Sequence, residues 1–254
     1  MSTPTSDLDS SNVLSSDQVR QFHRDGYLAP LTACSPEAMV DYREHCTALL
    51  KTDNETGRRE HNRHLDDATV WSICALPGIV NAMTSVLGSN LLLWRTNFFN
   101  KEPGGKEIPW HQDRNYWPIE PEIVVSAWLA LDRADTENSC VQVVPGTHRQ
   151  IIPHIKAGEE MAFTQMADTS GVDLSKTLDI ILEPGQFILF NERTLHHSEP
   201  NRSNRRRMGL AIRAILPQVR VLEFDSPSHR LMQLSGTDPM GFNLIGPPPT
   251  EAVI

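Results

Sequence analysis

The hydrophobic positions of residues 15–90 recur mainly at helical spacing. Ser15 precedes Gln18 by three residues, which is the capping-box pattern of a helix start, and Gly26 is of the type that ends helices. Two further helices are expected in SPEAMVDYREHCTALLKT and PGIVNAMTSVLG, where proline stands in the first turn. This part of the chain is therefore predicted to be mainly helical.

From residue 90 the pattern changes to short apolar runs, rich in β-branched, aromatic and leucine residues, with turn residues between them. The runs are NLLLWRTNFFN, EIVVSAWLALD, CVQVVPG, LDIILEPG, GQFILFNE and RMGLAIRAIL. Several short strands without long helices between them predict an antiparallel sandwich or barrel.

The 254 residues suit one large domain or two small ones, and the absence of a repeat or a clear linker favours one. Within it we expect a disordered polar tail over 1–14, helical support over 15–90, a β core over 91–220 and a C-terminal extension over 221–254. A polar insertion, 152–177, interrupts the core, and loops of this length are usually functional lids or disordered segments.

Composition limits the partners and the compartment. The net charge of −9 argues against nucleic acid as the main partner, and the apolar runs are too short for a membrane span. The polar N-terminus predicts no signal peptide, and four scattered cysteines indicate free thiols in a reducing compartment, which we take to be the cytoplasm. The basic run NRSNRRR, residues 201–207, fits a nuclear signal, a phosphate patch or, more commonly, a solvated turn. The oligomeric state is left open.

The segment WHQDRNYWP, residues 110–118, carries the first candidate chemistry. His111 and Asp113 are two positions apart, and residues i and i+2 of an extended chain point to the same side. Two histidines and one carboxylate on one face of an octahedron form the pattern of non-haem Fe(II) oxygenases, which leaves positions open for substrates. The alternative for HxD by itself is a polar strand end or turn.

The second histidine of such a site has to come from a distant strand. The candidates are His148, His154, His196 and His197. The last two follow the apolar run GQFILFNE, where a rigid strand aims a ligand well. Adjacent residues of an extended chain face opposite ways, so at most one of this pair should bind, and the spacing does not decide which.

The run RMGLAIRAI alternates with period two. One face is apolar and belongs to the core, and the other carries Arg207 and Arg213 with small residues between them. A buried arginine needs an anionic partner, and its forked guanidinium suits a carboxylate. A small dicarboxylate that chelates iron at one end would meet an arginine at the other. The alternative is an exposed strand face with two solvated arginines.

Taken together, these segments resemble the phytanoyl-CoA dioxygenase family of Fe(II)/2-oxoglutarate oxygenases over nearly the whole chain. The resemblance starts at LSSDQVRQFHRDGYL and runs through WHQD, AWLALDRADTENSCVQVVPGTHR and LHHSEPNRSNRRR. It implies a mainly β fold with flanking helices, built around a double-stranded β-helix core of the jelly-roll, cupin-like type.

The resemblance also implies a ligand set. His111 and Asp113 match the first two iron ligands of the family, and His196 matches the third because the family's HGS aligns with LHHS at this point. Arg207 matches the arginine that binds the distal carboxylate of 2-oxoglutarate. His197 replaces a frequent glycine and is expected beside the site or at the surface.

Two more residues are assigned to the cofactor site with Arg207. Trp128, in SAWLAL, stands where relatives often have a pocket aromatic, and Arg213 is the second arginine of its strand. His148, in PGTHR, is expected to be structural. Candidates for the lining of the substrate pocket are Asn97, Asn115, Trp117 and the insertion 152–177.

Within this family, the chain looks most like the syringomycin-type chlorinating enzymes. This likeness lies in the segments LLWRTNFFNKEPGGKEIPWHQD and RMGLAIR. Those enzymes carry Ala or Gly where Asp113 stands, and the missing carboxylate frees a position on iron for chloride. Asp113 fills that position and supplies its charge. The difference predicts hydroxylation in place of halogenation.

The expected function is therefore an Fe(II)/2-oxoglutarate-dependent dioxygenase that uses O2 to hydroxylate an unactivated C–H bond of a small metabolite. 2-Oxoglutarate would be decarboxylated to succinate and CO2. The same cofactor chemistry also permits desaturation, cyclisation or epimerisation. Two other classes compete: a non-catalytic jelly-roll binding module, and a zinc hydrolase, in which Arg207 would have no evident task.

Overall fold

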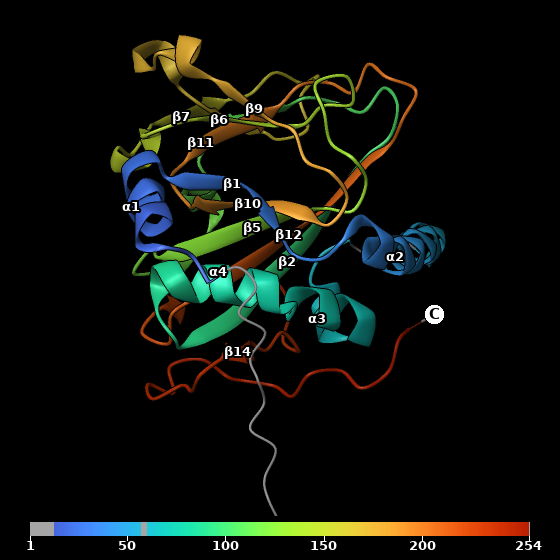
Figure 1. Ribbon diagram of the computed structural model, residues 1–254. Helices are drawn as coiled ribbons and strands as arrows, with labels where there is room; N and C mark the ends of the chain where they lie inside the picture. Colours follow the sequence, from blue (N-terminus) through green and yellow to red (C-terminus); the bar gives the residue numbers. More distant parts are fainter. Residues whose placement is uncertain (1–12, 57–59, 254) are drawn as a thin grey trace, which may run out of the picture.

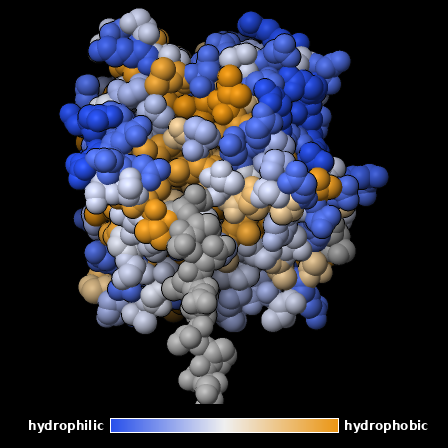
Figure 2. Space-filling model, viewed as in Figure 1, coloured by the Kyte–Doolittle hydropathy of each residue, from blue (hydrophilic) through white to orange (hydrophobic). Residues whose placement is uncertain are grey.

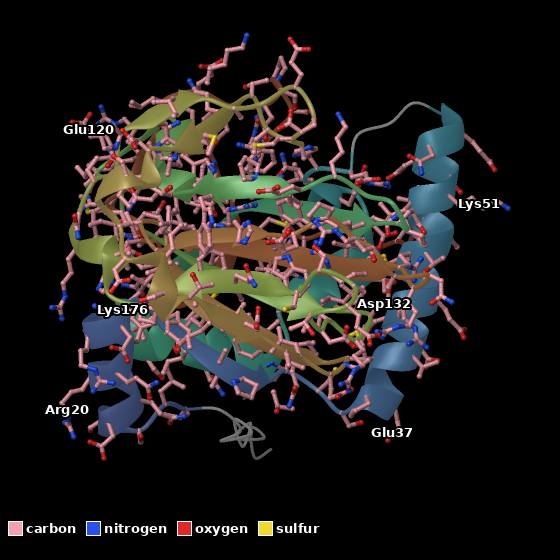
Figure 3. The ribbon with its side chains drawn as sticks, turned by 90° about the horizontal axis from the view of Figure 1, so that it is seen from above. Arg20, Glu37, Lys51, Glu120, Asp132 and Lys176 are labelled. Atoms are coloured by element: carbon pink, nitrogen blue, oxygen red, sulfur yellow. The ribbon has the colours of Figure 1, made fainter. Side chains whose placement is uncertain are left out.

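The computed structural model describes residues 13–56 and 60–253. Its α-helices are α1 (Ser16–Asp25), α2 (Pro36–Thr56), α3 (Ala68–Cys74) and α4 (Pro77–Leu87). Figure 1 shows α3 and α4 beneath a large sheet, α1 at its left beside β1, and α2 at its right. Viewed from above, α2 runs along that side, and Glu37 and Lys51 project outward near its two ends (Figure 3).

The three helices predicted from the sequence are confirmed. Ser15 caps α1 by accepting a hydrogen bond from the backbone N–H of Gln18, whose side chain in turn accepts from the backbone N–H of Ser15. Gly26 ends the helix with φ of 84°, a conformation that glycine adopts without steric cost. Of the expected tail, residues 1–12 lie outside the described residues, and Leu14 is buried in the core.

Two antiparallel sheets form the β core, as predicted. The larger sheet has the strand order β1 (Tyr27–Thr32), β10 (Gln186–Asn191), β5 (Val124–Ala130), β12 (Arg207–Ile215), β2 (Leu91–Lys101) and β14 (Met232–Ser235). The smaller has the order β3 (Ile108–His111), β11 (Leu195–Ser198), β6 (Val141–Val144) and β9 (Leu178–Ile180). Figure 1 shows the smaller sheet above the larger one, with α3 and α4 on the opposite side of the larger sheet. This is a jelly roll with flanking helices.

The alternation along β12 divides the interior into two layers. Met208, Leu210 and Ile212 are fully buried in the cluster that packs against the helices. Ala211 belongs to the cluster between the two sheets, with Trp128 of β5. Residues of β12 with odd numbers therefore face the space between the sheets, where a functional site can lie.

One detail differs from the helical region predicted, and two other segments have strands that the sequence pattern did not indicate. β1 lies within the predicted helical region and pairs with β10 as the edge strand of the larger sheet, a position that tolerates Pro30. The insertion 152–177 is structured: it holds the hairpin of β7 (His154–Lys156) and β8 (Gln165–Ala167). In the C-terminal extension, β14 pairs with β2.

Some apolar surface remains exposed on the face seen in Figure 2, over the edges where β9 and β1 lie. Leu178 of β9 and the neighbouring Ile181 are among the exposed apolar side chains. A short ladder also joins β4 (Ile119–Glu120) to β13 (Arg220–Val221). None of the described helices is by itself long and apolar enough to cross a membrane, and α3 with α4 pass that test only as a pair bent by 48°.

Candidate metal centre

His111, Asp113 and His196 converge between the two sheets. His111 ends β3, and His196 lies directly opposite it on β11, so the two rings are 4.1 Å apart. Asp113 begins the 3-10 helix η2 (Asp113–Tyr116), and its Oδ1 is 3.5 Å from Nε2 of His111 and 4.0 Å from Nε2 of His196. One ligand atom from each residue lies within 4.8 Å of the others, and no second group of this kind occurs among the described residues.

Main-chain carbonyl groups orient both imidazoles. Nδ1 of His111 lies 2.8 Å from the carbonyl oxygen of Pro109, and Nδ1 of His196 lies 2.8 Å from that of Thr194. A carbonyl can only accept, so Nδ1 carries the hydrogen in each ring. Both Nε2 lone pairs are thus left for a metal ion, which is the arrangement seen for metal-binding histidines.

Gln112 lies between His111 and Asp113 and binds this segment to neighbouring loops through hydrogen bonds. Its side-chain amide donates to the carbonyl oxygens of Gln150 and Arg193, and its oxygen accepts from the backbone N–H of Ile152. The side chain is fully buried. Because residues i and i+1 of an extended chain face opposite ways, Gln112 points away from the triad and braces it from behind.

Charges around Asp113 keep it ionised. Burial would raise its pKa, but Arg213 and the two imidazoles outweigh burial and hold the pKa of Asp113 below its ordinary value. Nη2 of Arg213 is 3.6 Å from Oδ2 of Asp113, on the side away from the histidines. Burial lowers the pKa of His196 to about 3, so this imidazole is neutral and able to bind a metal.

The structure separates the four candidate histidines. His197 faces away from the triad and stacks on Trp110 at 4.0 Å between ring centroids. His154 accepts a hydrogen bond from the backbone N–H of Gln112, and His148 contacts the carbonyl oxygen of His23 at the end of α1. Only His196 of the four lies at the triad, because only its position on β11 is opposite His111.

Arg207 is the first residue of β12 and is almost completely buried. Burial lowers its pKa to about 10, so it remains charged at neutral pH. Its Nε and Nη2 have no hydrogen-bond partner in the described part of the chain. A buried, unpaired guanidinium costs free energy, and an anion such as a carboxylate would relieve that cost.

Trp128 lies against Arg207, with the guanidinium carbon 5.1 Å from the ring centroid. The ring also covers Gly209, where an added Cβ would collide with the indole. The small residue that the sequence places between the two arginines thus makes room for Trp128. Arg207, Trp128 and the metal-binding triad line one shared pocket.

Lys101 was missed by the sequence analysis. It pairs with Arg207 in the β2–β12 register, and its ammonium donates to Ser139, to Ser198 and to the carbonyl of Glu199. Burial, followed by the charge of Arg207, lowers the pKa of Lys101 to about 7. The only sequence signal was its place at the end of NLLLWRTNFFNK, two residues beyond Phe99, on the same strand face.

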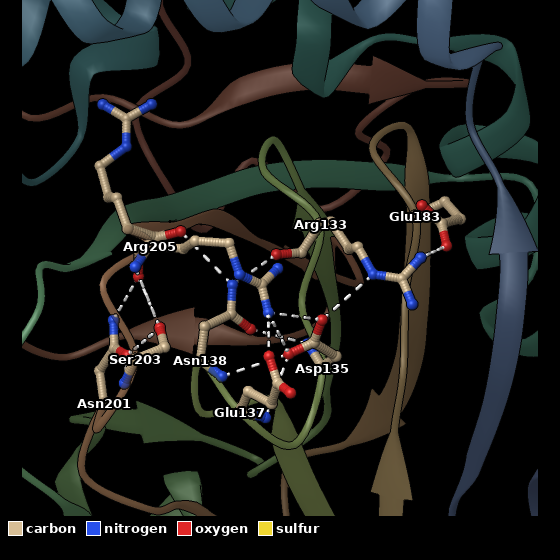
Figure 4. Close-up of polar contacts among 9 residues, drawn as sticks. Arg133, Asp135, Glu137, Asn138, Glu183, Asn201, Ser203 and Arg205 are labelled. Carbon is tan, nitrogen blue, oxygen red and sulfur yellow. Dashed lines mark hydrogen bonds and ion pairs between the residues drawn. The ribbon is translucent and has the colours of Figure 1, made fainter.

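The basic run 201–207 divides into paired and buried arginines. Figure 4 shows Arg205 reaching Asp135 and Glu137, with distances of 3.0 Å and 2.9 Å. Arg206 pairs with Asp132 at 2.8 Å, and the next residue turns inward as the first residue of β12. These acidic partners disfavour a nuclear signal or a phosphate patch, and the network braces the turn that leads to Arg207.

An outer cavity of about 420 Å³ adjoins the triad, and Asp113 and Arg213 border it. Two of the expected pocket residues, Asn97 and Trp117, lie on its wall. Asn115 does not: it is exposed and donates to the side chain of Gln165 at 2.8 Å, which ties η2 to β8.

The insertion 152–177 closes one side of this outer cavity. The ring of Phe163 packs edge-on against His111 at 5.0 Å and against Tyr116 at 5.7 Å. The hydroxyl of Tyr116 donates to the carbonyl of Gln165 at 2.9 Å. The insertion is therefore held against the metal-binding segment by both packing and hydrogen bonds.

A jelly roll that joins two histidines and a carboxylate to a buried arginine defines the Fe(II)/2-oxoglutarate-dependent oxygenases, and this chain is of that class. Within it, the family model of phytanoyl-CoA dioxygenase (PhyH) matches residues 22–209, and the chain belongs to that family. Fe(II), 2-oxoglutarate and O2 are accordingly its cofactor and cosubstrates. The enzymes of this family act on small molecules.

Curated relatives include a probable phytanoyl-CoA dioxygenase of Caenorhabditis elegans, 26% identical over 76% of this chain and 72% of its own length. The peroxisomal phytanoyl-CoA dioxygenase of Mus musculus is also 26% identical, but the chain spans only 60% of it. Among solved structures, the non-heme monooxygenase ThoJ in its apo form has a TM-score of 0.80 and 25% identity, covering 93% of this chain and 90% of that one. CytC3 with Fe(II) and alpha-ketoglutarate has a TM-score of 0.72 and 25% identity, covering 93% and 94%.

Proposed function

We propose that this chain hydroxylates an unactivated C–H bond of a small metabolite in a reaction that consumes O2 and 2-oxoglutarate. The observation that carries the proposal is the complete triad, because Asp113 supplies the carboxylate that a chlorinating enzyme leaves out. An iron position that a carboxylate fills is not available to a halide. Hydroxylation is thus favoured over halogenation.

His111, Asp113 and His196 would hold Fe(II), and Arg207 would bind the distal carboxylate of 2-oxoglutarate. The fit is supported by the two available Nε2 atoms, by the ionised carboxylate and by the unpaired atoms of Arg207. When bound, iron and 2-oxoglutarate supply the oxidising chemistry, in which 2-oxoglutarate is converted to succinate and CO2.

The chain's own residues position the reactants and exclude water. Trp128 fixes the guanidinium of Arg207 by its contact with the ring. Phe163 of the insertion covers His111 and narrows access from the solvent side. Arg213 holds Oδ2 of Asp113, which leaves Oδ1 directed at the metal position. The four free thiols among the described residues support a reducing compartment such as the cytoplasm.

The first test uses Fe(II)-loaded protein under anaerobic conditions. Addition of 2-oxoglutarate should produce a weak visible charge-transfer band, as expected when a keto acid chelates iron. A binding module without catalytic function and a zinc hydrolase predict no such band in an iron-loaded sample. A missing band would therefore count against the oxygenase.

The second test identifies the outcome of the reaction by the mass of the product. Hydroxylation adds one oxygen atom that derives from O2, whereas desaturation or cyclisation removes two hydrogen atoms and epimerisation leaves the mass unchanged. A metabolite screen that reports succinate above the substrate-free rate supplies the compound. A product without oxygen from labelled O2 would refute hydroxylation.

A further inference from the structure

Two cross-strand pairs of cations lie on one face of the larger sheet. In the β2–β12 register, Arg207 is opposite Lys101 at one end and Arg213 is opposite Arg95 at the other. Like charges directly opposite each other destabilise a sheet, so each pair calls for compensation by an anion. Under the proposed function, 2-oxoglutarate is the anion that compensates Arg207 and Lys101. The pair of Arg213 and Arg95 needs an anion of its own.

The two pairs stand at opposite ends of this strand face, although Arg207 and Arg213 both border the pocket that holds the metal-binding triad. Six residues separate Arg207 and Arg213 along β12, a distance of about 20 Å between their backbones. Between them stand only Gly209 and Ala211 on the same face. We assign the distal carboxylate of 2-oxoglutarate to Arg207, and Arg213 borders the same pocket at its other end, beside Asp113. The placement of Arg213 in the cofactor site stays a prediction.

The carboxylates near the second pair do not satisfy it. Nη2 of Arg95 is 2.9 Å from Asp225, but its Nε has no hydrogen-bond partner in the described chain. Nη2 of Arg213 is 3.6 Å from Asp113, while its Nε and Nη1 likewise lack partners. Asp113 would also bind the metal ion, so its negative charge is shared between the metal and Arg213. Arg213 is almost fully buried, and besides the shared Asp113 only the ring of Trp117, 5.1 Å from its guanidinium carbon, faces it, so two of its three nitrogens keep no hydrogen-bond partner among the described residues.

Both arginines open onto the outer cavity. Its volume of about 420 Å³ falls within the range of small-molecule sites. Asn97 lies on the same strand face as Arg95 and also borders this cavity. The remaining wall is largely aromatic and is formed by Phe99, Tyr116, Trp117 and Phe163.

We infer that Arg95 and Arg213 bind an acidic group of the substrate, and that the substrate is a small carboxylic acid with an apolar body. This inference rests on the proposed function, since it names the substrate class of the same site. The carboxylate would meet the unpaired guanidinium atoms, and the apolar body would lie against the aromatic wall. Because Arg213 also contacts Asp113, the acid is anchored beside the metal position.

The test measures binding without turnover, in Fe(II)-loaded protein kept anaerobic and saturated with 2-oxoglutarate. The charge-transfer band of this complex is the first reading, and its absence would mean that the proposed function has failed. With the band present, matched pairs of an acid and its amide are titrated, and the perturbation of the band is followed. The probes are phenylacetate and phenylacetamide, hexanoate and hexanamide, and benzoate and benzamide.

At least one acid should bind about tenfold to a hundredfold more tightly than its amide, as expected for hydrogen bonds to a charged partner. Arg95→Met should remove this preference while the affinity for 2-oxoglutarate, bound at the other end of β12, stays within about threefold. Arg20→Met is the matched control, because Arg20 is exposed on α1 and projects outward (Figure 3). It should keep the preference.

Arg95→Met leaves Asp225 without its ion-pair partner, so the double variant Arg95→Met/Asp225→Asn is measured in parallel. It removes both charges and should lose the preference for acids in the same way. If the amides bind as tightly as the acids in wild type, or if both Arg95 variants keep the preference while folded, the inference is wrong. The band with 2-oxoglutarate would still stand in either case, so the two proposals fail separately.

Discussion

Replacement of Gly209 by alanine should disturb the 2-oxoglutarate site without touching any polar group. Gly209 faces the space between the sheets, and a Cβ there would collide with the indole of Trp128. Forcing an extra methyl group into a packed interior costs about 1–3 kcal/mol. For a chain of this size the melting temperature should fall by roughly 2–10 °C.

The same displacement should weaken 2-oxoglutarate binding. Trp128 contacts the guanidinium of Arg207 at 5.1 Å, and a cation–π contact of this kind contributes about 0.5–2 kcal/mol. If the ring moves, Arg207 loses that contact, and the Kd for 2-oxoglutarate should rise by about twofold to thirtyfold. Thermal melting and anaerobic titration of the charge-transfer band measure the two effects on one sample.

A control and a rescue make this prediction specific. Gly171→Ala is the control, because an added Cβ at that exposed position would meet nothing within 4 Å. Trp128→Phe in the Gly209→Ala background supplies a smaller ring, so the double variant should recover part of the lost stability. A Gly209→Ala protein with the melting temperature and the 2-oxoglutarate affinity of wild type would refute the packing described for Trp128.

Three further variants test other parts of the site and the fold. Asp113→Gly should abolish hydroxylation, measured by product formation, and an unchanged activity would contradict the ligand assignment. Arg207→Gln should raise the Kd for 2-oxoglutarate by about tenfold to a hundredfold while the protein still binds iron, because charged hydrogen bonds are lost. Burial raises the pKa of the Glu192 carboxyl from its ordinary value of 4.5 to about 7 in the folded state. The contribution of its proton to stability is therefore fully present below pH 4.5 and is lost as the pH rises through about 7. Glu192→Gln should therefore be more stable than wild type by about 1–3 kcal/mol near pH 8 and equal to it near pH 4.5, as urea unfolding would show.

The β strands and the first helix were predictable because local signals agreed with the final fold. The capping box at Ser15, the terminating Gly26 and the alternation along RMGLAIRAI all act through neighbouring residues. β1 was missed because a strand at the edge of a sheet is decided by its partner, here β10, which follows it by more than 150 residues. Local pattern carries no information on such pairing.

The residues of the site likewise fall into those that local pattern predicts and those that depend on strand pairing. His111 and Asp113 are two positions apart in the sequence, and their convergence follows from local geometry. The choice between His196 and His197 depends on the register of β11 against β3, which alternation alone leaves undetermined. Lys101 and Arg95 were missed because their meaning depends on the cross-strand partners that β12 gives them.

The two imidazoles take their orientation from the peptide backbone, from the carbonyl oxygens of Pro109 and Thr194, each two residues earlier in the chain. A carbonyl oxygen is present whatever side chain the residue carries, so substitutions around the site leave this orientation intact. Residues on the wall of the outer cavity are then free to change in evolution and to alter which compound is accepted. The geometry of the metal ligands can therefore be conserved while the substrate that the fold accepts changes.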